Sequence, residues 1–246
     1  MSNHNNVGEF LAFLDSISPF SLQESWDNSG LILGSKEKYF TQIHLALEVD
    51  DKILEEAPKG ALILTHHPLI FSPLKQLIEE SYPFCLLKKA IQKDIQLISL
   101  HTNFDKTHFG AFVTQNLLGI YHFTQEGFVV NFKWEEDFQS LCLRCKKAFG
   151  LEILKVTQSP NPKCQNIALV TGSGAEFIRN LQGIDCLITG DIKYHQAMEA
   201  ISRQIHLIDC GHYELEAAFG EILLPILTNQ SYKAIISNSR NPFHFI

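Results

Sequence analysis

The chain has 246 residues, of which 45% are hydrophobic and 19% are charged, and this balance excludes a wholly disordered protein. Its 20 lysines and arginines against 27 aspartates and glutamates give a formal net charge of −7, which argues against nucleic acid as the main partner. Residues 1–18 show no basic segment followed by an apolar core, and no apolar run approaches the ~18 residues that a membrane span needs. We therefore expect a soluble, cytoplasmic protein without a membrane partner.

Apolar patterning predicts alternating strands and helices along the chain. In the first half, the predicted strands are 43–49, 61–65 and 95–100, and the predicted helices are 82–93 and 108–118. In the second half, the predicted strands are 166–170, 186–189, 206–209 and 233–237, and the predicted helices are 138–149, 175–181, 194–201 and 212–227. This alternation is typical of α/β proteins with mostly parallel or mixed sheets. The least regular stretch, 121–134, favours two α/β domains at 1–124 and 125–246, with the last strand near 233–246 able to pack on the first domain.

The six cysteines do not form the pattern of a disulfide framework in a small secreted protein. Cys142 and Cys145 have the spacing of a zinc or redox motif, but no second pair accompanies them. Phe138, Leu141 and Phe149 recur with these two cysteines at helical spacing. We therefore interpret the pair as part of the buried stripe of a helix.

Histidines and carboxylates gather just beyond the ends of predicted strands, where ligands bind in open α/β sheets. The residues in such positions are His66, His67, His101, Asp105, His195, His212 and Glu216. His212 and Glu216 are four residues apart at a predicted helix start, so they share one helix face. His66 and His67 would point in opposite directions on an ideal strand, which favours two ions with one imidazole each over a single ion.

Three or four imidazoles with two carboxylates and no thiolate suit two divalent metal ions, which could be Zn, Mn, Fe or Co. Paired ions ~3.5–4 Å apart are the usual hydrolytic arrangement, in which they activate water and hold the attacked group. Each feature also has a structural interpretation, since the His-His pair can end a strand before Pro68, His212 and Glu216 can cap a helix, and His195 can be structural. Their coincidence at successive strand ends favours the metal interpretation.

Two further motifs have simpler explanations. The segment TGSG at 171–174 could offer backbone N–H groups to an anion, but Phe177 replaces the third glycine of a dinucleotide fingerprint, so we interpret it as a tight turn. In the segment WDNSGL at 26–31, Asp27 or Asn28 could reach a ligand, although turn formation by Asn-Ser-Gly is the default interpretation.

Five blocks in order along nearly the whole chain resemble the GTP cyclohydrolase 1 type 2 homologue family, also called NIF-three-like or YbgI-like proteins. The blocks are WDNSGL at 26–31, HHPLIF at 66–71, HTNFD at 101–105, TGDIKYH at 189–195 and GHYELE at 211–216. The resemblance implies the family's short form, with two α/β domains and a dinuclear metal centre in the cleft between them. It also implies a ring-shaped homohexamer whose metal sites face an internal cavity.

The resemblance implies specific ligands as well: His66, His67, Asp105, His212 and Glu216, with Glu216 bridging both ions. His101 would lie beside the metals, as a further ligand or as a proton-transfer group. The chain departs from the family pattern at Glu48, where aspartate is more usual, and at 106–110, where a double-glycine turn is usual.

These observations lead to a hypothesis of a dinuclear metal-dependent hydrolase that acts on a small, nucleotide-like substrate, with His101 as the candidate for proton transfer. A metal-binding scaffold or regulatory protein without turnover is the alternative, because hydrolytic and structural sites share ligand types. A partner-binding adaptor without metal is a third interpretation. The sequence leaves the native metal and the substrate open.

Overall fold

The computed structural model describes residues 5–237 and 240–244, and the chain divides into two compact units. Unit 1 comprises Met1–Phe104 and Phe219–Ile246, and unit 2 comprises Asp105–Ala218. The units therefore divide the chain at other places than the predicted boundary after residue 124. The irregular stretch expected at 121–134 forms a β-hairpin inside the sheet of unit 2.

Unit 1 is built on a five-stranded mixed sheet with the strand order β13-β4-β5-β6-β2. The strands are β2 (Gly30–Leu33), β4 (Ile43–Ala46), β5 (Leu62–Thr65), β6 (Gln96–Ser99) and β13 (Ala234–Ile236). Strands β13, β4, β5 and β6 run parallel, and β2 is antiparallel to β6. Every residue of β4, β5 and β6 is buried, as in sheets covered on both faces, which explains their nearly continuous apolar sequences. A separate two-stranded sheet pairs β1 (Asn5–Asn6) with β3 (Tyr39–Phe40).

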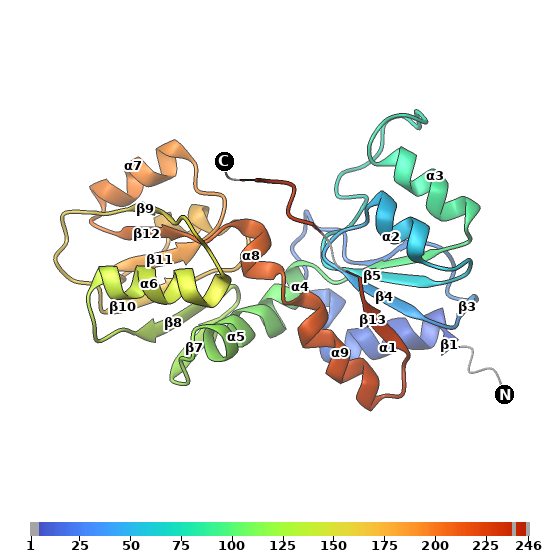
Figure 1. Cartoon of the computed structure of the whole chain (residues 1–246), viewed down its shortest axis with the longest axis horizontal. Helices are drawn as coiled ribbons and strands as arrows, with labels where there is room; N and C mark the ends of the chain where they lie inside the picture. Colours follow the sequence, from blue (N-terminus) through green and yellow to red (C-terminus); the bar gives the residue numbers. More distant parts are fainter. Residues whose placement is uncertain (1–4, 238–239, 245–246) are drawn as a thin grey trace. The chain divides into compact units, whose positions relative to one another are not determined.

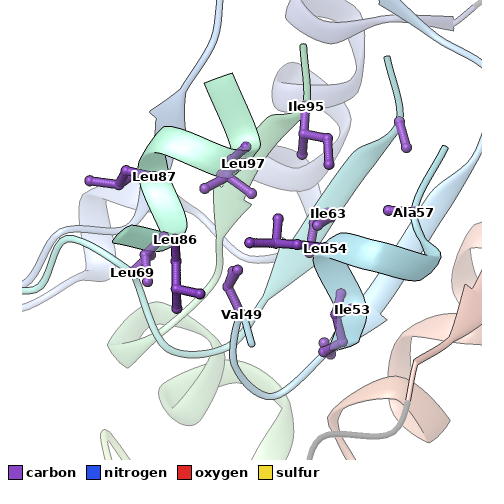
Figure 2. Packing of buried hydrophobic residues seen from close by; sticks show 13 residues of the cluster. Val49, Ile53, Leu54, Ala57, Ile63, Leu69, Leu86, Leu87, Ile95 and Leu97 are labelled. Atoms are coloured by element: carbon purple, nitrogen blue, oxygen red, sulfur yellow. The ribbon is translucent and has the colours of Figure 1, made fainter. Parts of the chain in front are cut away.

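Helices cover both faces of this sheet. They are α1 (Val7–Ile17), α2 (Asp51–Glu56), α3 (Phe84–Gln92), the single turn α4 (Thr102–Phe104) and α9 (Phe219–Asn229), with a 3-10 turn at Phe20–Leu22. Helices α2 and α3 bury Ile53, Leu54 and Leu87 against Ile63 and Leu97 of the strands, as Figure 2 shows. Helices α1 and α9 lie on the other side of the sheet (Figure 1). The sheet is thereby held between two helical layers, with its strand ends left for the loops that carry the candidate residues.

Unit 2 contains a six-stranded mixed sheet with the order β7-β8-β10-β11-β12-β9. Its strands are β7 (Phe123–Glu126), β8 (Val129–Lys133), β9 (Lys155–Thr157), β10 (Asn166–Leu169), β11 (Cys186–Thr189) and β12 (His206–Asp209). Strands β10, β11 and β12 are parallel, whereas β7, β8 and β9 are antiparallel to their neighbours. Together with unit 1, this confirms the prediction of an α/β fold with mixed sheets.

The helical segments of unit 2 differ in part from the prediction. They are α5 (Gly110–Phe112) between π-helical turns at Asp105–Phe109 and Val113–Leu117, α6 (Phe138–Phe149), a 3-10 helix at Ala175–Arg179, α7 (Tyr194–Ser202) and α8 (His212–Glu216). The segment expected as one helix over 212–227 is two helices, α8 and α9, and the break between them coincides with the return of the chain to unit 1.

Helix α6 confirms the interpretation of the cysteine pair. The Asp137 side chain accepts a hydrogen bond from the Ser140 N–H at its start, and Gly150 ends it in the left-handed conformation. Leu141, Cys142 and Cys145 are its buried residues. Burial raises the pKa of the Cys142 thiol to about 12, which disfavours the thiolate that metal binding needs. None of the helices in the described part of the chain has the length and apolarity to cross a membrane.

Candidate metal centre

Unit 1 brings together three histidines that the sequence analysis placed at strand ends. His66 and His67 follow β5, and His101 follows β6, which is the parallel neighbour of β5. Each offers a ring nitrogen, and the three nitrogens lie within 4.8 Å of one another. We call these residues the imidazole group. His66 is fully buried, whereas His67 and His101 are half-buried.

The rings of His66 and His67 lie next to each other, with centroids 4.8 Å apart, and both adjoin the ring of His101. Adjacent residues of an ideal strand would point to opposite faces, but β5 ends at Thr65 and the backbone bends at both histidines. The hydroxyl of Thr65 donates a hydrogen bond to the His67 carbonyl at 2.8 Å, which holds this bend. The expectation of opposed rings therefore does not hold here.

All three rings use Nδ1 for a hydrogen bond inside the protein. His66 Nδ1 lies 2.8 Å from the Leu100 carbonyl oxygen, and His67 Nδ1 lies 3.1 Å from Glu48 Oε1. His101 Nδ1 lies 2.7 Å from Asp27 Oδ1. A backbone carbonyl or a carboxylate at one ring nitrogen fixes the tautomer and leaves the other nitrogen as the electron-pair donor. This is the partner pattern that metal-binding histidines show.

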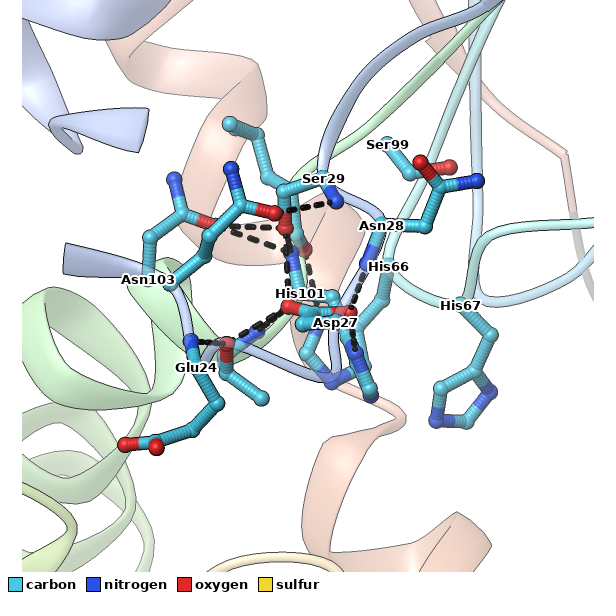
Figure 3. Close-up of polar contacts among 12 residues, drawn as sticks. Glu24, Asp27, Asn28, Ser29, His66, His67, Ser99, His101 and Asn103 are labelled. Carbon is cyan, nitrogen blue, oxygen red and sulfur yellow. Dashed lines mark hydrogen bonds and ion pairs between the residues drawn. The ribbon is translucent and has the colours of Figure 1, made fainter. Parts of the chain in front are cut away.

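The loop at 26–29 holds His101 in place (Figure 3). Asp27 accepts hydrogen bonds from the Thr102 N–H at 3.0 Å and from the Thr102 hydroxyl at 2.5 Å, in addition to its bond with His101. The Ser29 hydroxyl oxygen accepts a hydrogen bond from the His101 N–H at 3.1 Å. Burial alone would raise the pKa of the Asp27 carboxyl, but the hydrogen bond and charge of His101 and the bonds from Thr102 hold that pKa well below its usual range. Asp27 is therefore ionised and orients the imidazole.

Unit 2 brings together the remaining candidates, Asp105, His212 and Glu216, which we call the carboxylate group. His212 is the first residue of α8 and Glu216 its last, and the i,i+4 spacing places His212 Nε2 3.1 Å from Glu216 Oε2. Asp105 and Glu216 each offer an oxygen, and these oxygens lie within 4.8 Å of each other. His212 repeats the pattern of unit 1, because its Nδ1 lies 2.7 Å from Asp191 Oδ2.

Both carboxylates of this group are buried, with exposures of 8% for Asp105 and 2% for Glu216. Two buried carboxylates so close together repel each other unless positive charge is shared between them. The Thr171 hydroxyl donates a hydrogen bond to Asp105 at 3.2 Å but supplies no charge. The donor chemistry of both groups, imidazole nitrogens and carboxylate oxygens, therefore fits divalent cations of the Zn, Mn, Fe or Co type.

The turn after β10 approaches the carboxylate group closely. Gly172 has a φ of +62°, and a Cβ at this position would lie 2.2 Å from Glu216 Oε1 and 3.5 Å from His212 Nε2. The segment at 171–174 is thus a tight turn, as interpreted from the sequence, and it also forms one wall of the carboxylate group. Only glycine fits both the backbone conformation and the space.

The residues that orient the histidines are not apparent from the sequence. No pattern pairs Glu48 or Asp191 with a ring, and the pattern around Asp27 indicates a turn or a contact with a ligand. His195 takes no part in either group, because it lies exposed on α7 beside Tyr194. No cysteine belongs to a candidate metal-binding group within the described residues 5–237 and 240–244.

The fold and these groups define a class: a mixed α/β protein with histidine and carboxylate clusters at its strand ends that could bind divalent metal. The family model of Duf34/NIF3 (NGG1p interacting factor 3) matches residues 5–242, and the chain belongs to this family. The resemblance stated from the sequence is thereby confirmed.

Relatives of similar length carry related names. A protein from Helicobacter pylori named GTP cyclohydrolase 1 type 2 is 44% identical over 98% of this chain and 99% of its own. A GTP cyclohydrolase 1 type 2 homolog from Campylobacter jejuni is 42% identical over 97% of this chain and 99% of its own. Among solved structures, a Staphylococcus aureus protein shares the fold with a TM-score of 0.87 at 24% identity, covering 98% of this chain and 99% of that one.

Proposed function

We propose that this protein is a dinuclear metal-dependent hydrolase of a small, nucleotide-like substrate. The imidazole group and the carboxylate group would together form one centre, in which His66, His67, Asp105, His212 and Glu216 would be the ligands of two divalent ions. His101 would act in proton transfer beside them. The names of the relatives at 42% and 44% identity support a nucleotide such as GTP as the first substrate to test.

One observation carries the proposal. Four histidines, His66, His67, His101 and His212, each use Nδ1 to contact a carbonyl or carboxylate oxygen at 2.7–3.1 Å. A carbonyl or carboxylate oxygen at Nδ1 is the usual partner of a metal-binding histidine, whereas the structural His44 has a hydroxyl oxygen there. The departure of this chain from its family at Glu48 preserves the arrangement, because the glutamate still reaches His67.

Short sequence separations support the proposal that the imidazole group and the carboxylate group form one centre. Asp105 follows His101 by four residues, and an extended chain spans at most ~3.6 Å per residue. Glu216 precedes Phe219 by three residues, and the Phe219 ring packs in unit 1 with its centroid 5.6 Å from that of His66. Both carboxylates are therefore tethered within reach of the imidazole group, which is why we propose a single centre.

Divalent ions held by these residues would lower the pKa of a bound water and polarise the bond under attack. The protein residues have separate tasks. Glu48 and Asp191 hold His67 and His212 in the tautomer that carries the electron pair on Nε2. The ionised Asp27 keeps His101 oriented, so that its Nε2 can accept a proton and return it to a leaving group.

We place the protein in the cytoplasm, where its six free cysteines stay reduced. We also propose a homohexamer, which the resemblance implies, and a small-molecule substrate, with neither a membrane nor nucleic acid as partner.

A turnover assay tests the proposed activity. Protein stripped of metal and then reloaded with Zn or Mn is offered GTP and a panel of phosphoesters, and the loaded protein should hydrolyse at least one of them. The stripped protein should be inactive, and His101→Gln should lower kcat by about 100-fold or more while it keeps its metal. Undiminished turnover by stripped protein would contradict the proposal, and bound metal without any turnover would favour the metal-binding scaffold.

A further inference from the structure

Two large aromatic side chains lie exposed beside the imidazole group. Trp26 and Phe71 are 57% and 51% exposed, and their ring centroids are 5.8 Å apart with an angle of 58° between the planes. Single exposed aromatic residues are common, but these two adjoin each other and together present uncovered ring surface. We call them the aromatic pair.

The aromatic pair adjoins the same histidine that the proposed function uses. The centroid of the His101 ring lies 6.3 Å from that of Trp26 and 6.0 Å from that of Phe71, and its plane is nearly perpendicular to both. The same centroid lies 5.0 Å from that of His66 and 5.4 Å from that of His67. His101 is therefore a neighbour both of the metal-binding candidates and of the exposed aromatic pair.

Hydrogen bonds fix the two loops that carry these rings. Asn28 Nδ2 donates to the Ile70 carbonyl at 2.6 Å, so the loop that carries Trp26 is joined directly to the residue before Phe71. Asp27 is bound to Thr102, and Leu69 is buried in the core of unit 1. The rings are thus held in place by a rigid backbone although the rings themselves are exposed. Such preorganisation lowers the entropy cost of binding a ligand.

From this arrangement we infer that Trp26 and Phe71 bind a planar heteroaromatic ring of the substrate by stacking, and hold it beside His101. The inference rests on the proposed function, because it names the substrate class of the same site. A ring stacked at ~3.5–4 Å on either aromatic face lies within about one ring width of His101. Stacking on aromatic side chains is worth enough to dominate binding of a nucleobase and does not depend on a particular base. The aromatic pair therefore selects planar heteroaromatic substrates as a class.

Fluorescence gives a direct test, because the chain has only two tryptophans. In a Trp134→Phe protein, Trp26 is the single tryptophan, and guanosine serves as an uncharged planar probe. We expect saturable quenching by guanosine and none by ribose at the same concentrations. Absence of quenching by guanosine in the folded, metal-loaded protein would overturn the inference.

Substitutions show which side chains contribute to guanosine binding. Measured by calorimetry, Trp26→Leu and Phe71→Leu should each raise the Kd for guanosine about tenfold, and Trp26→Phe should restore most of the affinity. The matched control is Tyr39→Leu, which removes another exposed aromatic side chain of unit 1 and should leave the Kd unchanged. Equal affinity of all four variants and the wild type would contradict the inference.

Two further readouts separate this inference from the proposed function. Metal content by elemental analysis should be the same in Trp26→Leu and wild type, because the aromatic pair contributes no ligand. A protein without metal whose guanosine affinity still depends on Trp26 would refute the proposed function and support the stacking site. Molar mass by light scattering should also be unchanged, and a smaller assembly in Trp26→Leu would show that the aromatic pair is instead a contact between copies of the chain.

Discussion

At the scale of single residues, the partners at Nδ1 distinguish these histidines from ordinary core histidines. Asp27 is the best placed of these partners, since its carboxylate contacts both His101 and Thr102. His206 offers a contrast within the same chain. Both of its ring nitrogens bind backbone groups, with Nδ1 accepting from the Ser159 N–H at 3.2 Å and Nε2 lying 3.0 Å from the Asn161 carbonyl oxygen. Because backbone groups occupy both of its ring nitrogens, His206 is structural.

The substitution Asp27→Asn should therefore separate catalysis from metal binding. The amide lacks the carboxylate charge that orients His101, so kcat should fall by about 10- to 100-fold. Metal content should stay near the wild-type value, because the hydrogen bonds of Asp27 with other side chains go to His101, Thr102 and Ser29 and not to the five proposed ligands. The control Glu37→Gln removes an exposed carboxylate and should change neither quantity. Loss of metal together with kcat would instead make His101 a ligand.

Gly172 gives a second test at the residue scale. In Gly172→Ala the new methyl group would lie 2.2 Å from Glu216 Oε1, so the carboxylate must move away from its position. Metal affinity should fall at least tenfold, measured by titration of the stripped protein with Zn or Mn.

The matched control is Gly183→Ala, which has a similar φ of +68° but no atom within 4 Å of the new Cβ. Both variants should lose about 1 kcal/mol of stability from the left-handed backbone, and only Gly172→Ala should lose metal. Equal metal affinities in the two variants would show that Glu216 is not a ligand.

At the scale of secondary-structure elements, the strands were the most predictable part of the chain. The residue ranges of β11 and β12 agree with the prediction, because buried parallel strands have continuous apolar sequences with sharp ends. The histidines at the ends of β5 and β6 followed from the same reasoning. The hairpin β7–β8 was missed although its turn residue Gly127 has a φ of +55°, as tight turns require. Helix α1 was missed although Asn6 accepts a hydrogen bond from the Glu9 N–H at its start.

Other features depend on tertiary structure and left no local signal. The break between α8 and α9 falls at Ala217 and Ala218, and alanine is the best helix former. The carboxylate partners of His101, His67 and His212 lie 74, 19 and 21 residues away in the sequence. Pairings of this kind arise only when the sheet brings distant loops together, so the sequence indicates the candidate ligands but not the residues that orient them.

The contact between β4 and β13 predicts how stability depends on pH. His44 on β4 is buried, and its Nδ1 lies 2.9 Å from the Ser237 hydroxyl oxygen just after β13. Within the described residues its Nε2 has no hydrogen-bond partner, and burial lowers the pKa of His44 below its usual 6.5. The unfolded chain therefore binds a proton on His44 more tightly than the folded protein does. The contribution of the neutral His44 to the free energy of unfolding is fully present above pH 6.5 and is lost as the pH falls below that value.

The Tm of the wild type should therefore fall between pH 7.5 and pH 5.5, and His44→Gln should reduce this fall. Differential scanning calorimetry at both pH values measures the effect. His122→Gln, which replaces an exposed histidine, should leave the pH dependence unchanged. An identical fall in Tm for His44→Gln and the wild type would assign the acid sensitivity to other groups.

At the scale of the whole molecule, the assembly is a separate prediction. A homohexamer should have about six times the 27.9 kDa mass of the chain when measured by light scattering after size-exclusion chromatography. Comparison of the masses of metal-loaded and stripped protein shows whether the assembly depends on the ions. A monomer or dimer at micromolar concentration would contradict the hexamer without affecting the ligand set, since every ligand named here belongs to one chain.

The metal content of each chain is the most direct test of the proposed metal centre, in which Glu216 would be a ligand. Elemental analysis of protein purified without chelator should find about two ions per chain in the wild type and in Glu221→Ala, which removes an exposed glutamate of α9. In Glu216→Ala the content should fall sharply while the circular dichroism spectrum stays that of a folded protein. If the wild type holds no metal even after addition of Zn or Mn, or if Glu216→Ala holds as much as the wild type, the proposed centre is wrong.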